Sequence, residues 1–473
     1  MERGEGSGEL VKTLSRWELL AIGLGAVIGW SWVIYAGMWS SKGGTLGGIL
    51  AFAICGVLCS LIGLVYAELT SAFPRAGGDV VFAFEGIGER AAIFVSWAMV
   101  LLWVGLITIE TLMFPVILEG LGMKVPEFGK LYSLGGTSIY LSYLLISLIG
   151  NAFFAYINFR GVKISSVFQM IAVVVLLLAA LFFVFSGVIK GEPSNAKPLF
   201  GSLGGISLVF LMVPGFLSGF NAIPQASEEA KVPNRILGAS VIYTVWGSVL
   251  FYVAIILGLG FAANLSMRSA EGLVVVDAVG KLFNGSGIAK FFVTFAALFG
   301  MLTTWNAAYM AGSRLIYGLS RAKFIPENLA VINPKYRTPS IIILILFAFS
   351  TLFCLLGTSK SIYVGIVNVF SLFLVVTWFL VSIAFLRLRY KRPELERPYK
   401  VSAGKLIGYI ATVFSALYIL VYTPLSPGGL SGYEWLAVGV IIAVMLTLYF
   451  AWNTRKGYLP TEERRILLRG DNI

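Results

Sequence analysis

The chain has 473 residues, of which 58% are hydrophobic and 12% charged, whereas soluble domains carry about 25% charged residues. Histidine is absent, which excludes Ser-His-Asp triads and imidazole-ligated metal or haem sites. The sequence also lacks a Gly-x-x-x-x-Gly-Lys-Ser/Thr nucleotide-binding motif. These features predict a membrane protein with many spans that is not an enzyme and holds no metal or cofactor.

Twelve apolar runs are long enough to cross the hydrocarbon core, which takes about 20 residues of helix. Because the runs are continuous, they predict an all-α polytopic membrane protein with 12 transmembrane helices. A tail at 1–16 precedes them and a tail at 454–473 follows them. The runs are 17–39, 46–72, 91–118, 138–158, 163–189, 202–227, 236–262, 288–316, 340–357, 361–386, 405–424 and 433–453.

The net charge of +12 is unevenly distributed between the two sides of the predicted membrane. The side that holds both termini carries 26 Lys and Arg residues, and the other side carries nine. By the positive-inside rule, both termini are cytoplasmic and the protein is a multi-pass protein of the plasma (inner) membrane. The largest basic cluster, 387–405, faces anionic headgroups of the lipid bilayer, so no nucleic acid partner is expected.

Two of the runs contain residues that interrupt a helix near mid-membrane. The first run has three glycines at 23–29, and the sixth has two prolines and two glycines at 214–224. We therefore expect helices 1 and 6 to be discontinuous, with breaks near 26–31 and 215–220. Two broken helices five positions apart are typical of transporters with an inverted repeat, although kinks that serve packing alone are the alternative.

Broken helices offer a binding site for a zwitterion without many charged side chains. Each break exposes backbone N–H groups at one half-helix and carbonyl groups at the other. The N-terminal ends favour anions and the C-terminal ends favour cations. A free amino acid carries both charges a short distance apart, so it suits such a site.

Six short motifs, in the same order along the chain, resemble those of the amino acid–polyamine–organocation (APC) superfamily of permeases. The resemblance covers nearly the whole chain and implies a five-plus-five inverted repeat (LeuT-like). The repeats would be 17–189 and 202–386, with 405–453 outside them. The motifs are Gly-Ala-Val-Ile-Gly at 25–29, Tyr-Ala-Glu-Leu at 66–69, Pro-Arg-Ala-Gly-Gly at 74–78, Asn-Phe-Arg-Gly-Val-Lys at 158–163, Gly-Phe-Asn-Ala-Ile-Pro-Gln at 219–225 with Glu228 and Glu229, and Ser-Arg-Leu-Ile-Tyr at 313–317.

The resemblance also implies the substrate-binding residues. The substrate carboxylate would meet N–H groups around Trp30 and Ser31, and its ammonium would meet carbonyls near Val27, Gly215 and Ser218. The full expected set is Val27, Ile28, Gly29, Trp30, Ser31, Glu110, Gly215, Phe216, Ser218, Gly219 and Asn221.

The chain departs from the family pattern at two of these places. Gly29-Trp30-Ser31 stands where members usually have Gly-Ser-Gly, so Trp30 and Trp32 either line the pocket, pack between helices or anchor at the interface. Asn221 stands where many relatives have Glu, and an amide does not titrate.

Ionisable residues within spans are functional candidates, because burying a charge in lipid is costly. Glu110 is expected to handle a proton or pair with a cationic substrate, or else to be a neutral structural carboxyl. Lys163 matches a lysine that takes the place of a structural sodium ion in some proton-coupled relatives, filling the contact between runs 1 and 8. Alternatively, Lys163 is a snorkelling residue that extends its charged end to the membrane surface and has no role in coupling. Thr303 and Thr304 are the candidates for holding sodium.

Charged residues near the cytoplasmic ends of runs 6 and 8 are candidates for an inner gate, namely Glu228, Glu229, Arg75, Arg314 and Arg321. The predicted function is a secondary active transporter, a proton-coupled symporter that moves an amino acid by alternating access. The alternatives are an amine or polyamine carrier, an amino acid exchanger, a sodium-coupled symporter, and a channel. The expected partners are a small-molecule substrate, an amino acid or amine, and protons, with sodium as the alternative ion.

Overall fold

The computed structural model describes residues 10–134, 137–270, 272–355, 360–424, 426, 429–456 and 460–469, with the backbone alone at 134, 137, 360–364 and 452–456. The outermost parts of both predicted tails and the last two residues of the predicted run 340–357 lie outside these described residues.

Nine helical segments of the described chain are long and apolar enough to cross a membrane, if α1 and α2 count as one bent span. Helices suit lipid because they satisfy their own backbone hydrogen bonds. The axes of α1 and α2 differ by 52°. The segments are α1 (Arg16–Ile28) with α2 (Ser31–Lys42), α3 (Thr45–Ala72), α5 (Glu89–Gly120), α6 (Leu141–Phe159), α7 (Val162–Lys190), α10 (Asn234–Ala262), α13 (Gly287–Arg321), α15 (Lys360–Lys391) and α17 (Gly432–Lys456).

Three shorter apolar helices fall within the other predicted runs, so the full count of twelve spans stays a prediction. They are α8 (Leu203–Phe216), α14 (Ser340–Cys354) and α16 (Gly404–Leu420). The remaining helices are short and connect these elements. They are α4 (Asp79–Gly86), α9 (Ala222–Ala226), α11 (Leu265–Arg268), α12 (Val274–Leu282), α18 (Thr461–Arg469) and the 3-10 turns η1 (Pro193–Ala196), η2 (Ser227–Glu229) and η3 (Glu327–Leu329).

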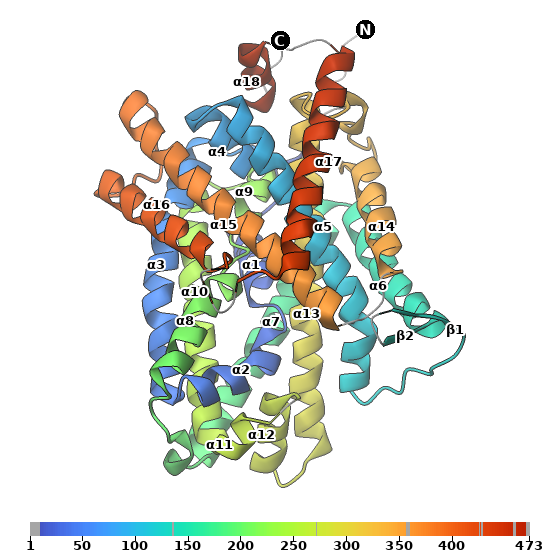
Figure 1. Cartoon of the computed structure of the whole chain (residues 1–473), viewed down its shortest axis with the longest axis vertical. Coiled ribbons are helices and arrows are strands. Elements are labelled where there is room, and N and C mark those ends of the chain that lie inside the picture. Colours follow the sequence, from blue (N-terminus) through green and yellow to red (C-terminus); the bar gives the residue numbers. More distant parts are fainter. Residues whose placement is uncertain are drawn as a thin grey trace.

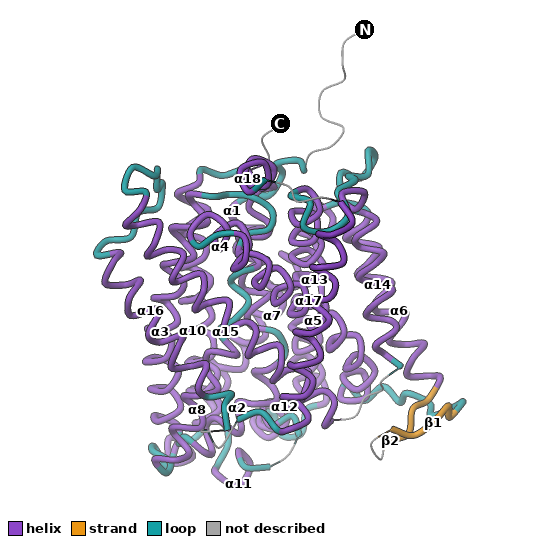
Figure 2. Tube along the Cα trace, turned by 45° about the horizontal axis from the view of Figure 1, so that its top comes forward, coloured by secondary structure: helices purple, strands orange, loops and turns teal. Residues whose placement is uncertain are grey.

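A small antiparallel hairpin corrects the expectation that the chain is entirely helical. Strand β1 (Lys130–Leu134) pairs with β2 (Thr137–Tyr140) at the edge of the molecule (Figure 2). The predicted run 138–158 therefore begins too early, since α6 begins at Leu141. Thr, Ile and Tyr in β2 favour strands, and the hairpin satisfies backbone groups that would otherwise begin the helix.

The long helices pack in pairs that join the two predicted halves of the chain. Helix α3 packs along α10, α5 along α13, and α6 against α14. Helix α4 follows α3 and lies at the same end as α18, whereas α12 follows α10 and lies at the opposite end (Figure 1). We call these the α18 end and the α12 end. Connecting helices in matching positions at opposite ends are what an inverted repeat would produce.

The predicted C-terminal tail contains a docked helix, α18. Within it, Arg464 and Leu468 are buried, and Arg464 forms an ion pair with Glu89 at the start of α5. Since α18 contacts both α4 and α13, it joins elements that are far apart in the sequence.

Candidate functional site

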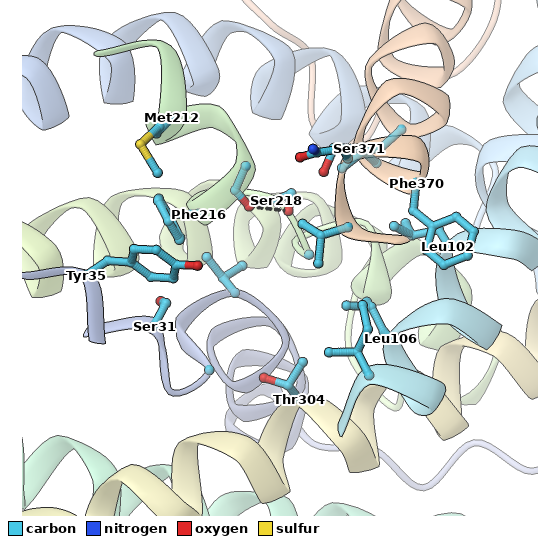
Figure 3. A pocket seen from close by; sticks show the side chains of 18 of the residues that line it. Ser31, Tyr35, Leu102, Leu106, Met212, Phe216, Ser218, Thr304, Phe370 and Ser371 are labelled. Carbon is cyan, nitrogen blue, oxygen red and sulfur yellow. Dashed lines mark hydrogen bonds between the residues drawn. The ribbon is translucent and has the colours of Figure 1, made fainter. Parts of the chain in front are cut away.

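A cavity of about 770 Å³ lies where the breaks of α1–α2 and α8–α9 face α5, α13 and α15 (Figure 3). It extends along α8 from Gly204, in the first turn, to Gly215 and to Gly219 in the break. Ten of the eleven predicted substrate residues line it: Val27, Ile28, Gly29, Trp30, Ser31, Glu110, Gly215, Phe216, Ser218 and Gly219.

The first break lies at Gly29 and Trp30, within the predicted interval. Helix α1 ends at Ile28, Gly29 has a φ of 54°, and α2 begins at Ser31. Gly300 allows α13 to approach this break closely, because a Cβ at Gly300 would lie 2.0 Å from the Gly29 carbonyl oxygen. Within the described residues, the N–H groups of Gly29, Trp30 and Ser31 have no hydrogen-bond acceptor, so they can bind an anion.

The carbonyl groups at the end of α1 accept hydrogen bonds from side chains. The hydroxyl of Tyr252 lies 2.8 Å from the Ile28 oxygen and 3.2 Å from the Val27 oxygen. Ser31 Oγ also donates to Ile28 O at 3.1 Å and lies 3.0 Å from the Tyr252 hydroxyl. Tyr252 was missed by the sequence analysis. A buried Tyr hydroxyl needs a partner, but the sequence of α10 does not say which one.

The second break covers residues 217–221, between α8 and α9, and it touches the first. Pro214 removes a backbone donor from the last turn of α8, and Gly219 has a φ of 109°. A Cβ on Gly219 would lie 2.5 Å from Ala26 O, so the backbones of the two breaks are in direct contact. Ser218 Oγ donates to Gly215 O at 2.6 Å. A larger residue at position 219 would therefore disturb the junction itself, not the cavity alone.

The side chains around the cavity are mainly apolar and aromatic. Leu102, Leu106 and Phe370 lie across the cavity from Tyr35 and Phe216 (Figure 3). The polar lining includes the hydroxyls of Ser31, Ser207, Ser218, Ser371 and Thr304. This lining suits a ligand with an apolar body and a small polar end.

Glu110 is the one charged side chain among the described residues that line the cavity. It is 3% exposed, and the side chain of Trp30 is within hydrogen-bonding reach of it. Within the described residues its Oε2 atom has no hydrogen-bond partner. Trp30 thus lines the cavity beside Glu110, whereas Trp32 is fully buried and packs edge-on against Phe251, with ring centroids 5.9 Å apart.

Asn221 and Lys163 do not line the cavity. Asn221 is fully buried, its amide nitrogen lies 3.8 Å from Met99 Sδ, and its Oδ1 has no partner among the described residues. Lys163 lies in the first turn of α7, where its Nζ binds Glu18 Oε1 at 2.7 Å and its side chain is 61% exposed. The expectation that Lys163 fills the contact between runs 1 and 8 is therefore wrong.

Gln169, nearly two turns further along α7, fills that contact instead. Its amide nitrogen donates to Thr303 O at 3.1 Å and to Ala21 O at 3.3 Å, and its carbonyl oxygen accepts from Asn306 at 2.8 Å. Uncharged hydrogen bonds thus join α1, α7 and α13. The hydroxyls of Thr303 and Thr304 donate to backbone oxygens, Thr303 to Gly300 O at 2.7 Å.

Ion pairs close the α18 end of the molecule around η2. Arg314 makes two hydrogen bonds to Glu229, at 2.7 and 3.1 Å, and neither side chain is exposed. Arg321 holds Glu228 at 2.7 and 3.0 Å, and Glu228 also accepts from Ala76 N at 2.8 Å. Burial would raise the pKa of Glu228, but the Arg321 guanidinium outweighs it, so the pKa lies below its ordinary value.

Asp79, at the start of α4, is a fully buried carboxylate at the same end that the sequence analysis left without a role. It accepts from the Tyr66 hydroxyl at 2.5 Å and from Gln225 of α9 at 2.8 Å. Burial raises the pKa of Asp79 to about 6, against the lowering effect of these hydrogen bonds. The short half-helix α9 is thus tied to α3 and α4 through Asp79.

Comparison with known proteins agrees with this architecture. The sequence profile of the family described as amino acid permease matches residues 14–450. Similar proteins from Bacillus subtilis (strain 168) include a methylthioribose transporter, 26% identical over 96% of each chain, and a branched-chain amino acid permease, 25% identical over 88% of this chain and 89% of the relative. An aspartate-proton symporter of the same organism is 23% identical over 96% of this chain and 86% of the relative.

These matches confirm the resemblance to APC permeases that the sequence motifs carry. The matched family and these relatives are permeases and transporters, not enzymes. With several apolar helices long enough to cross a bilayer, the chain is a multi-pass membrane protein. It belongs to the amino acid permease family.

Proposed function

We propose that the chain is a secondary active transporter that moves an amino acid across the membrane by alternating access. One observation carries the proposal: a cavity at the junction of two broken helices, where three adjacent N–H groups of Gly29, Trp30 and Ser31 lack an acceptor among the described residues. These N–H groups would bind the carboxylate of the substrate. The apolar lining favours an amino acid with an apolar side chain.

The ammonium of the substrate needs acceptors on the other side of the cavity. In our proposal these are the second lone pairs of the Val27 and Gly215 oxygens and the carboxylate of Glu110. Because Glu110 is the single charged group in the described lining, it also supports a second candidate, a carrier of amines without a carboxylate or an amino acid exchanger. A ligand lacking a carboxylate would leave the three N–H groups unpaired, so we favour the amino acid.

We further propose coupling to protons, with Glu110 as the group that binds and releases the proton. Its burial and its unpartnered Oε2, as far as the described residues go, support this role. Sodium coupling is less well supported, because the amide of Gln169 and the hydroxyls of Thr303 and Thr304 already bond the carbonyls between α1 and α13. Lys163 would contribute to proton coupling only through its ion pair with Glu18.

The proposed topology has twelve spans, a five-plus-five inverted repeat, and both termini in the cytoplasm of a plasma (inner) membrane protein. Arginines concentrated at the α18 end support this orientation, among them Arg314, Arg321, Arg389, Arg392 and Arg464. In this orientation the ion pairs of Glu228 and Glu229 form the inner gate, and the cavity extends toward the outside.

A counterflow experiment tests the proposal. Purified protein is first screened by thermal unfolding against amino acids and amines, because a ligand of the folded state raises apparent stability. The best ligand is then loaded into proteoliposomes, and the uptake of labelled ligand is followed. A carrier shows saturable uptake that unlabelled ligand on the inner side accelerates. Uptake that neither saturates nor shows counterflow would indicate a channel and contradict the proposal.

A further inference from the structure

A second, smaller cavity of about 210 Å³ lies at the α18 end, apart from the central cavity. It is bounded by the end of α4, the loop before α5, the last turns of α15 and the helix α18 (Figure 1). Its charged lining residues are Glu85, Arg387, Lys391, Arg392 and Arg465. The two cavities share no lining residue.

Positive charge in this cavity exceeds negative charge. Glu85 is unexposed, and it already binds Arg392 at 2.6 Å and Arg469 at 2.9 Å, with Arg465 Nε 3.7 Å away. One carboxylate therefore faces four cationic lining residues and Arg469. Glu462, which does not line the cavity, pairs with Arg465 at 2.5 Å and is 73% exposed.

Three donors at the cavity remain available for a ligand. Within the described part of the chain, neither Arg387 nor Lys391 has an acidic partner. The Nε atom of Arg465 is buried, and no described residue accepts a hydrogen bond from it. This atom lies 3.7 Å from Glu85 Oε2, beyond hydrogen-bonding distance, so it can still donate a hydrogen bond to an added anion.

The position of these residues suits the surface of a bilayer. Arg387 and Lys391 are four residues apart on the last turns of α15, so they lie on one face of the helix where the span ends. Basic pockets between spans at this depth bind lipid phosphate groups.

We propose that this cavity binds a phosphate group between α4, α15 and α18. Arginine side chains bind phosphate oxygens with paired hydrogen bonds, and lysine binds them as a point charge. The phosphate belongs either to an anionic phospholipid headgroup or to a soluble phosphate. In both cases the ligand joins Arg465 of α18 to Arg387 and Lys391 of α15, and so fixes the C-terminal helix to the transmembrane bundle.

The test compares the full chain in nanodiscs of phosphatidylglycerol and of phosphatidylcholine, the latter with and without inorganic phosphate. The readouts are the midpoint of thermal unfolding and, by native mass spectrometry, the number of retained phosphatidylglycerol molecules. The test variant is Arg387→Gln with Lys391→Gln. The control, Lys335→Gln with Lys400→Gln, removes two exposed positive charges outside the cavity.

For a lipid ligand, phosphatidylglycerol raises the midpoint of the wild type and the control, and the test variant loses both this shift and one retained lipid. For a soluble phosphate, inorganic phosphate raises the midpoint in phosphatidylcholine, and the test variant binds it about tenfold or more weakly. Arg465→Gln leaves α15 intact, and we expect it to lose the same response as the test variant, whether to the lipid or to inorganic phosphate. Equal responses of test variant and control, or no response of the wild type to either probe, would overturn the proposal.

Discussion

At the scale of single residues, the proposed coupling to protons depends on Glu110. It is nearly unexposed, lines the central cavity and is within reach of Trp30. An ionised carboxylate in such a place is unfavourable unless a cation or a proton neutralises it. Binding of either a proton or the substrate ammonium to Glu110 would therefore stabilise the loaded state.

Glu110→Gln keeps the shape of the side chain and removes its ionisation. We expect accumulation of substrate against a gradient to be lost and any remaining exchange to be independent of pH between 5 and 8. Uptake into proteoliposomes with an imposed pH gradient measures this. The matched control is Glu119→Gln on the same helix, outside the cavity lining. Unchanged pH dependence in Glu110→Gln would assign Glu110 a structural role.

Asp79 predicts a pH dependence of stability. Its pKa of about 6 in the folded protein lies above its ordinary value of 3.8, so the folded state binds the proton more tightly. The free energy of unfolding therefore falls as pH rises from about 4 to about 6, by an amount on the order of 3 kcal/mol, and this contribution is constant above that range. In Asp79→Asn the midpoint of thermal unfolding should fall less over this range than in the wild type. If the midpoints of the wild type and Asp79→Asn changed in parallel with pH, Asp79 would not titrate in this range.

Single residues also mark where sequence reasoning ends. The backbone at Gly29 and Gly219 was predictable because glycine and proline act locally on their own helix. Tyr252 and Gln169 were not, because their roles depend on which helices meet them. The sequence analysis assigned Lys163 to a contact that Gln169 fills. Gln169 lies six positions further along α7, so its side chain projects from a different height and face of the helix.

At the scale of elements, the short helix α9 and the turn η2 connect the central cavity to the α18 end. Their side chains are held by α13 through Arg314 and Arg321 and by the segment 76–79. Opening this end requires these contacts to break together. The sequence pointed to these charged residues as candidates for a gate, but only the packing of α9 against α13 pairs Glu229 with Arg314 and Glu228 with Arg321.

Arg314→Gln leaves Glu229 buried without its counter-charge. We expect a loss of about 3–5 kcal/mol in the free energy of unfolding, because breaking one side of a buried ion pair is strongly destabilising. The double variant Arg314→Gln with Glu229→Gln should recover part of this loss. Thermal and denaturant unfolding in detergent measure both, with the exposed Lys335→Gln as control. If Arg314→Gln were as stable as Lys335→Gln, Arg314 and Glu229 would not form a buried ion pair.

Elements with a strong apolar pattern were predicted well, and those that depend on partners were not. The long helices and both interruptions follow from runs of apolar residues and from glycine and proline. The hairpin β1–β2 lies at the edge of a run whose first residues fit a strand equally well. Helix α18 carries five charged residues among nine, so its docking depends on Glu85 and Glu89 of other elements.

At the scale of the whole molecule, two broken helices meet at one cavity, and charged pairs close one end. The pairing of α3 with α10 and of α5 with α13 places helices at corresponding positions of the two predicted repeats side by side. The central claim is that the cavity at this junction holds the transported amino acid.

Equilibrium binding of a labelled amino acid to purified Gly215→Leu tests this claim most directly. A Cβ at Gly215 would meet no atom within 4 Å, so the new side chain enters the cavity without disturbing the junction. The matched control is Gly439→Leu on α17, where a Cβ also meets nothing and no cavity is lined. We expect Gly215→Leu to bind the labelled amino acid about tenfold or more weakly than the wild type, and Gly439→Leu to bind it with unchanged affinity. Wild-type affinity in a folded Gly215→Leu would contradict it.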